Sequence, residues 1–143
     1  MSNQFVRKSR LRVMTLADPA LNGDAIWTVP SGVSWSVLAG SYIFDTIAVT
    51  GAGVANVYVL SEDAVQVWNF VSSAAAGPGV AAFVTLSING ATWSTLAPTV
   101  LTIAIPETIL MPTDTLYYSY AGSTGDIQVR ACRLAVKETI LGY

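Results

Sequence analysis

The sequence predicts an all-β protein: an antiparallel β-sandwich of jelly-roll type with about eight strands, preceded by an extended N-terminal arm. Apolar stretches are short and rich in Val, Ile, Thr and aromatic residues, and turn residues interrupt them every 8–12 residues or so. No stretch shows the 3.6-residue periodicity of an amphipathic helix. A chain of 143 residues is long enough for one domain with a two-layer core. We expect an arm over residues 1–16 and a single sandwich domain over residues 17–143.

The first half of the body contains four expected strand regions. Residues 25–29 form the first, and residues 33–49 form two strands or one strand bent at Gly40, because glycine inside a strand marks a bend or bulge. Residues 54–60 and 65–71 are expected to pair across a short acidic turn.

The second half contains four more expected strands, at residues 80–88, 101–105, 116–121 and 127–136. Asn89-Gly90 predicts a tight hairpin turn after the first of these, with the return strand beginning at Trp93. Eight strands without helices favour a jelly roll. A Greek-key sandwich of the immunoglobulin type is the structural alternative, although the Cys…Trp…Cys pattern of that fold is absent.

The composition predicts self-association. Hydrophobic residues make up 52% of the chain and charged residues only 11%, whereas soluble domains average about 25% charged residues. So few charges cannot cover the surface of a monomer, and large uncharged patches mark interaction sites. We therefore expect a homo-oligomer, with a trimer as the favoured form.

Basic residues are concentrated at the N-terminus, where Arg7, Lys8, Arg10 and Arg12 supply four of the seven Lys and Arg residues. The rest of the chain has three basic and nine acidic residues. Such an arm can hold a neighbouring subunit, form an ordinary first strand, or contact nucleic acid. Four charges bind nucleic acid weakly and the acidic body repels phosphate, so we expect a protein partner and no nucleic acid.

Aromatic residues provide further candidates for contact. Tyr117, Tyr118 and Tyr120 crowd one short strand, and side chains alternate along a strand, so Tyr117 lies opposite the other two. Tyrosine is enriched at protein interfaces, which makes Tyr117 a candidate contact residue. The tryptophans are expected in the core or an interface rather than on a carbohydrate-binding platform.

The sequence offers no constellation of catalytic or metal-binding residues. It contains no histidine and a single cysteine, Cys132, expected as a buried small hydrophobe. Glu62 and Asp63 point to opposite faces if extended, which is poor geometry for paired carboxylates. Asp114 and Asp126 would have to meet in space to bind calcium, and their spacing matches no known loop. We expect no enzyme activity, catalytic residue, cofactor or metal.

Residues 71–88 are apolar enough to resemble a membrane span, but Gly77-Pro78-Gly79 interrupts them and alternation follows. No secretory signal pattern opens the chain, so we expect a protein assembled in the cytoplasm without a membrane contact.

The run from Ile26 to Trp35 is an apolar strand, a Val-Pro-x-Gly turn and a second strand opening with tryptophan. With the basic arm and the charge-poor body, it resembles small phage virion proteins of the capsid decoration or cement type. The resemblance implies a jelly-roll homotrimer on the capsid surface, with the major capsid protein or other virion subunits as partners. Arg7, Lys8, Arg10, Arg12 and Tyr117 would make these contacts.

Two other functions fit the same sequence. The chain could be another virion component, such as a tail, collar or fibre adaptor, or a host-binding or carbohydrate-binding module, which would display exposed Trp and Tyr. A small carboxylate-dependent hydrolase would need two acidic side chains converging in a pocket.

Overall fold

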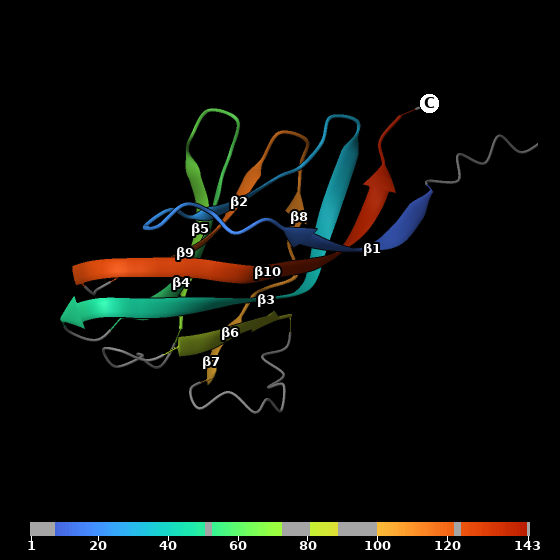
Figure 1. Ribbon diagram of the computed structural model, residues 1–143. Helices are drawn as coiled ribbons and strands as arrows, with labels where there is room; N and C mark the ends of the chain where they lie inside the picture. The colour runs from blue at the N-terminus through green and yellow to red at the C-terminus, as the bar shows by residue number, and fades with distance from the viewer. Residues whose placement is uncertain (1–7, 51–52, 73–80, 89–99, 122–123, 143) are drawn as a thin grey trace, which may run out of the picture.

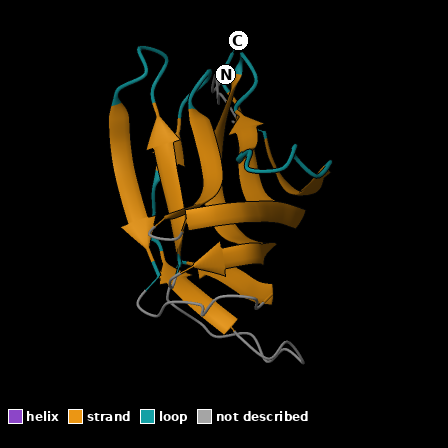
Figure 2. Cartoon of the chain, turned by 60° about the vertical axis from the view of Figure 1, so that its left-hand side comes forward, coloured by secondary structure: helices purple, strands orange, loops and turns teal. Residues whose placement is uncertain are grey.

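The computed structural model describes residues 8–50, 53–72, 81–88, 100–121 and 124–142, which form two packed β-sheets (Figure 1). No helix occurs in the described residues, so none of them forms a helix long enough to cross a membrane. The prediction of an all-β sandwich is confirmed. Figure 2 shows the two layers, with strands from each sheet facing one another.

Each sheet takes strands from both halves of the chain. The larger sheet has the order β1 (Ser9–Leu16), β10 (Thr124–Ile140), β3 (Val33–Thr50), β6 (Ala81–Ser87) and β7 (Val100–Ala104), and the two-residue β8 (Ile109–Leu110) also pairs with β3. The smaller sheet has the order β2 (Ala25–Thr28), β9 (Thr115–Ala121), β4 (Val54–Leu60) and β5 (Gln66–Val71).

The strand pairs are nested, which identifies the jelly-roll connection. β1 pairs with β10, β2 with β9, β3 with β6 and β4 with β5, all antiparallel. The chain thus folds like one long hairpin whose paired strands alternate between the two sheets. Pairing of β10 with β3 and of β9 with β4 then joins these hairpin pairs within each sheet. This connection differs from that of an immunoglobulin sandwich.

Two expectations about pairing need correction. β7 runs parallel to β6, although antiparallel sheets are expected from the sequence; the expected turn at Asn89-Gly90 and the return strand from Trp93 lie outside the described residues. Ser9–Leu16 is not a free arm, because it pairs residue for residue with Thr139 to Cys132 of the same chain. These residues instead form an ordinary first strand, which was the alternative interpretation of the basic segment. Residues 1–7 lie outside the described part of the chain.

At the predicted bend, Gly40 of the larger sheet lies directly against the Tyr118 side chain of the smaller sheet. Gly40 pairs with Leu134 of β10, between two register irregularities of the β3–β10 ladder. A Cβ atom built on Gly40 would lie 2.2 Å from the Tyr118 hydroxyl oxygen and 2.8 Å from a Leu86 methyl carbon. That hydroxyl donates a 2.8 Å hydrogen bond to the Arg133 carbonyl. Only glycine leaves room for the Tyr118 side chain to reach across.

A β-bulge in β10 ends the pairing with β1. Ala131 has a φ of 52°, and the ladder shifts register between Arg130 and Arg133. The carboxylate of Asp18, just beyond β1, accepts a 3.1 Å hydrogen bond from the Ala131 amide. A bulge frees one amide from the ladder, and here the side chain of Asp18 satisfies it.

The core lies between the sheets and contains the residues that alternation assigned to it. Trp27 and Trp35 are buried, as predicted, and Trp68 packs partly buried against the same cluster. Tyr118 is fully buried and stacks on Tyr42 with ring centroids 4.6 Å apart. Cys132 is buried, as predicted, and burial followed by the Asp18 charge raises the pKa of its thiol to about 11.

Candidate partner-binding site

Glu138 forms a buried charge cluster at the end of the larger sheet. It is the only charged residue buried among the described ones, with 2% of its surface exposed. Arg10 of β1 and Trp35 of β3 lie directly opposite it on the two flanking strands. Its carboxylate accepts hydrogen bonds from Trp35 Nε1 at 2.9 Å, Arg12 Nη1 at 2.8 Å and Arg10 Nε at 3.0 Å.

These donors hold Glu138 in its ionised form. Burial alone would raise the pKa of the carboxyl, but the hydrogen bonds from Trp35, Arg12 and Arg10 outweigh it and lower the pKa to about 2. Because the donors come from both neighbouring strands, the carboxylate ties β1 to β10 and β3.

This cluster changes the interpretation of the predicted contact residues. Arg10 and Arg12 are paired inside the chain, although the Arg10 side chain remains 67% exposed and its outer surface can still meet a partner. Lys8 is exposed just before β1, and Arg7 lies outside the described residues. The basic segment is therefore an edge of the sheet rather than a detached arm.

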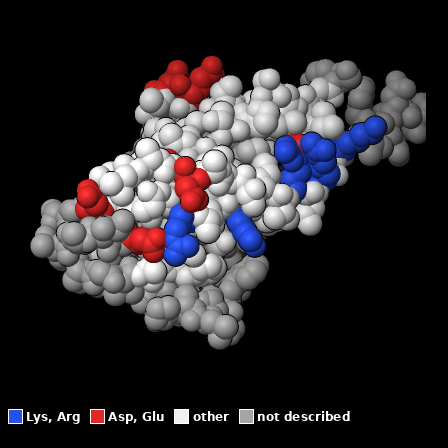
Figure 3. Space-filling model, viewed as in Figure 1, with Lys and Arg blue, Asp and Glu red and all other residues white. Residues whose placement is uncertain are grey.

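The described cations all belong to the larger sheet or its border. Besides Lys8, they lie on β1 and on the adjacent β10, where Arg130 forms an ion pair with Asp45 of β3. Figure 3 shows one basic group over β1 and another over the middle of β10, separated by uncharged surface. Two outward residues next to the arginines of β1 are apolar: Leu11 is 67% and Val13 70% exposed.

The outer face of the smaller sheet has the opposite character. Its four strands contain no Lys, Arg, Asp or Glu. Ile26, Tyr117, Tyr58 and Asn69 form one row across it, each directly opposite the next on the adjacent strand. Tyr58 and Tyr117 stack with centroids 4.6 Å apart and an 8° angle between their planes. We call this row the tyrosine face.

Alternation placed Tyr117 correctly, away from the core-facing Tyr118 and Tyr120. Its stacking partner Tyr58 is not predictable from the sequence, because it lies on another strand and local alternation does not set the register between strands. Tyr117 also lies on the other sheet from Arg10 and Arg12, so the predicted contact residues form two separate surfaces.

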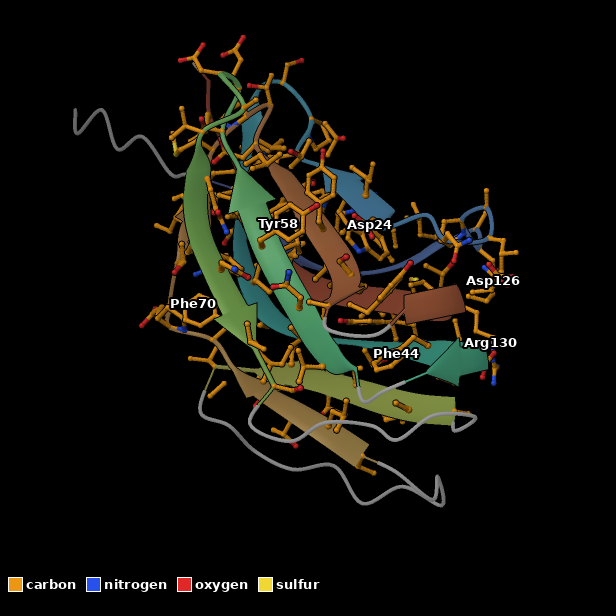
Figure 4. All side chains as sticks on the ribbon, turned by 90° about the vertical axis from the view of Figure 1, so that its left-hand side faces the viewer. Asp24, Phe44, Tyr58, Phe70, Asp126 and Arg130 are labelled. Carbon is orange, nitrogen blue, oxygen red and sulfur yellow. The ribbon has the colours of Figure 1, made fainter. Side chains whose placement is uncertain are left out.

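The carboxylate of Asp24 is hydrogen-bonded at the border of the tyrosine face. Asp24 accepts hydrogen bonds from the Tyr58 hydroxyl at 3.1 Å and from the Ser119 hydroxyl at 2.7 Å. Figure 4 shows Asp24 next to Tyr58. Partial burial and the nearby Asp24 charge raise the pKa of Tyr58 to about 12, so its hydroxyl stays protonated.

Comparisons with known proteins give no relative. A scan against protein-family models, a search of curated proteins and a search of solved structures each returned no match.

The carboxylates do not gather into a second kind of site in the described part of the chain. Asp114 lies just before β9, and Asp126 lies on β10, after β9 in the chain. The Asp114 carboxylate accepts a hydrogen bond from the Met111 amide, and the Asp126 carboxylate accepts one from the Asn22 side-chain amide. No group of three or more Cys, Asp or Glu residues close enough to hold a metal occurs among the described residues. The site residue that sequence reasoning missed is Glu138. Its signal was a lone carboxylate at an inward position of an alternating strand.

Proposed function

We propose that this protein is a non-enzymatic structural subunit of a phage particle, of the capsid decoration or cement type. In this proposal it forms a homo-oligomer on the capsid surface, contacts the major capsid protein or another virion subunit, and is assembled in the host cytoplasm. The observation that carries the proposal is the tyrosine face, a charge-free sheet surface on a jelly-roll body. Jelly rolls recur in capsid proteins, although they also occur in lectins and enzymes.

The tyrosine face has the composition of a protein-binding surface. The centres of protein interfaces are depleted of charge and enriched in tyrosine, and their rims are polar. Here Ile26 and the Tyr58–Tyr117 pair form an uncharged centre, while Asp24 and the acidic turn at Glu62 form the border. Such a face supports attachment to a shell protein.

The geometry favours a protein partner over a sugar. Tyr58 and Tyr117 are a cross-strand pair stacked on each other, so each ring covers one face of its neighbour. A sugar-binding platform needs ring faces open to the ligand. The Tyr58 hydroxyl already donates its hydrogen bond to Asp24, so its proton does not face a ligand.

The first test is composition: mass spectrometry of purified particles should find the chain in stoichiometric copies. Ile26→Lys places a charge in the tyrosine face and should abolish binding to shells that lack the protein. Leu21→Lys is the matched control, because Leu21 is similarly exposed but lies in a loop before β2. Equal binding by both variants, or absence of the chain from particles, would contradict the proposal.

The N-terminal contribution is tested by deleting residues 2–7. This deletion removes Arg7 while leaving Arg10 and Arg12 on Glu138, whereas a cut through residue 12 would strip the buried carboxylate of both guanidinium groups. We expect a folded protein that attaches more weakly to its shell. Unchanged attachment would restrict the contact to the tyrosine face.

A further inference from the structure

Two edge strands lie on opposite sides of the sandwich. β1 ends the larger sheet and β5 ends the smaller one, so along one side each has no paired strand among the described residues. β5 contacts β7 at the far edge of the larger sheet, which places β5 on the side away from β1. A contact between these edges therefore joins different copies.

The β5 edge lacks the features that normally protect a strand edge. Gln66–Val71 contains no charged residue and no proline, and Val67 and Val71 are at least half exposed. Natural edges of this kind carry charges or proline, or another element covers them. The turn before β5 carries the exposed acids Glu62 and Asp63.

The β1 edge has the complementary character. Leu11 and Val13 are its outward apolar residues, and Lys8, Arg10 and Arg12 carry positive charge. Two β1 strands paired along their length around a twofold axis would run antiparallel and bring the Arg12 residues of both copies together. Pairing with β5 instead offers Lys8 the acidic turn, while Arg10 and Arg12 keep their pairing with Glu138.

We propose that β1 of one copy adds to β5 of the next copy, as a strand-to-strand contact that repeats around a closed ring. This rests on the proposed homo-oligomer and identifies its interface. A contact between two different surfaces of the same chain is head-to-tail, and such contacts build cyclic rings when the rotation closes. Strand addition satisfies the unpaired backbone of both edges at once.

The charges select a parallel alignment. In a parallel pair, Lys8 at the start of β1 lies beside the turn at Glu62 and Asp63, and Arg10 and Arg12 follow along β5. In an antiparallel pair, Lys8 would lie near Val71, roughly 20 Å from the acids at the strand rise of about 3.3 Å per residue. The sandwich already contains one parallel pair, β6 with β7.

The test is sedimentation velocity of the purified full-length protein at low ionic strength, without shells. Lys8→Glu should raise the dissociation constant by up to about fivefold, and so should Glu62→Lys with Asp63→Lys. The triple variant restores opposite charges and should recover association. Lys137→Glu makes the same charge change as Lys8→Glu on β10, the strand next to β1, and Glu107→Lys reverses one acid in the loop before β8. Both single variants should leave association unchanged.

The outcomes separate this interface from its alternatives. A monomeric wild type at micromolar concentration would overturn the contact, and so would a triple variant as weak as both parents combined. Unchanged association of the Glu62→Lys, Asp63→Lys variant would indicate an interface without the β5 turn, such as β1–β1 pairing, and would also overturn it. Because shells are absent from the experiment, each of these results leaves the shell-binding test of the proposed function to be decided separately.

Discussion

The two sheets of the sandwich differ in their content of charged residues. The larger sheet carries the described cations and uses several of them internally, in the Glu138 cluster and in the Arg130–Asp45 pair. The strands of the smaller sheet carry no charge and present stacked tyrosines outward. A basic segment in a sequence therefore need not be a binding arm, and the uncharged sheet is the better candidate for an interface core.

The largest expected effect on stability tests the contact between Gly40 and Tyr118, which joins the two sheets. Gly40→Ala would force a Cβ into the position of the Tyr118 hydroxyl, whose ring is buried and held by its hydrogen bond to the Arg133 carbonyl. We expect a loss of roughly 3 kcal/mol or more of unfolding free energy, measured by urea denaturation. Gly32→Ala is the control: φ is +82° there but the space is open, so strain alone should cost about 1 kcal/mol. Equal losses would contradict the steric explanation.

The second prediction concerns the internal charge of the larger sheet. Glu138→Gln removes the negative charge facing Arg10 and Arg12 and should lower unfolding free energy by roughly 2–3 kcal/mol. The exposed Glu107→Gln should change it by less than about 0.5 kcal/mol.

The same cluster predicts a pH dependence. The pKa of Glu138 falls from its ordinary 4.5 to about 2 in the folded protein, so its ionised form stabilises the fold. This stabilisation is complete above pH 4.5 and is lost as the pH falls towards 2. Wild type should therefore lose more stability than Glu138→Gln between these pH values, and parallel acid titrations of the two would contradict the assignment.

The sequence predicted the fold because strand alternation is local information. Tyr117 and Tyr118 point to opposite faces wherever their strand sits, and Gly40 marks a bend without knowledge of its neighbours. The misassigned arm shows the limit. β1 is stabilised by pairing with a strand more than a hundred residues away and by Glu138, and neither partner is visible from residues 1–16 alone. For the same reason, the tyrosine face could be assembled only after the strand order was known.

A smaller effect of opposite sign is expected at the bulge of β10. Ala131 adopts a positive φ of 52°, where a Cβ costs about 1–2 kcal/mol. Ala131→Gly removes that cost but adds unfolded-state entropy, so the net gain should be about 0.5 kcal/mol. Ala104→Gly, at an exposed strand position without positive φ, should instead destabilise by about 0.5–1 kcal/mol. A loss at both positions would show that the bulge is not strained.

The smallest effect on stability is expected on the outward side of β1. Leu11 and Val13 are exposed, so Leu11→Ser with Val13→Ser should change unfolding free energy by less than about 0.5 kcal/mol per site, measured on the monomer at high dilution. Met14→Ser is the inward control on the same strand and should cost more, because Met14 packs against the core. If the outward pair serves an interface, the double variant should sediment as a monomer where wild type associates. If the double variant associates like wild type, Leu11 and Val13 make no contact between copies of the chain. The tyrosine face would then be the remaining candidate contact surface.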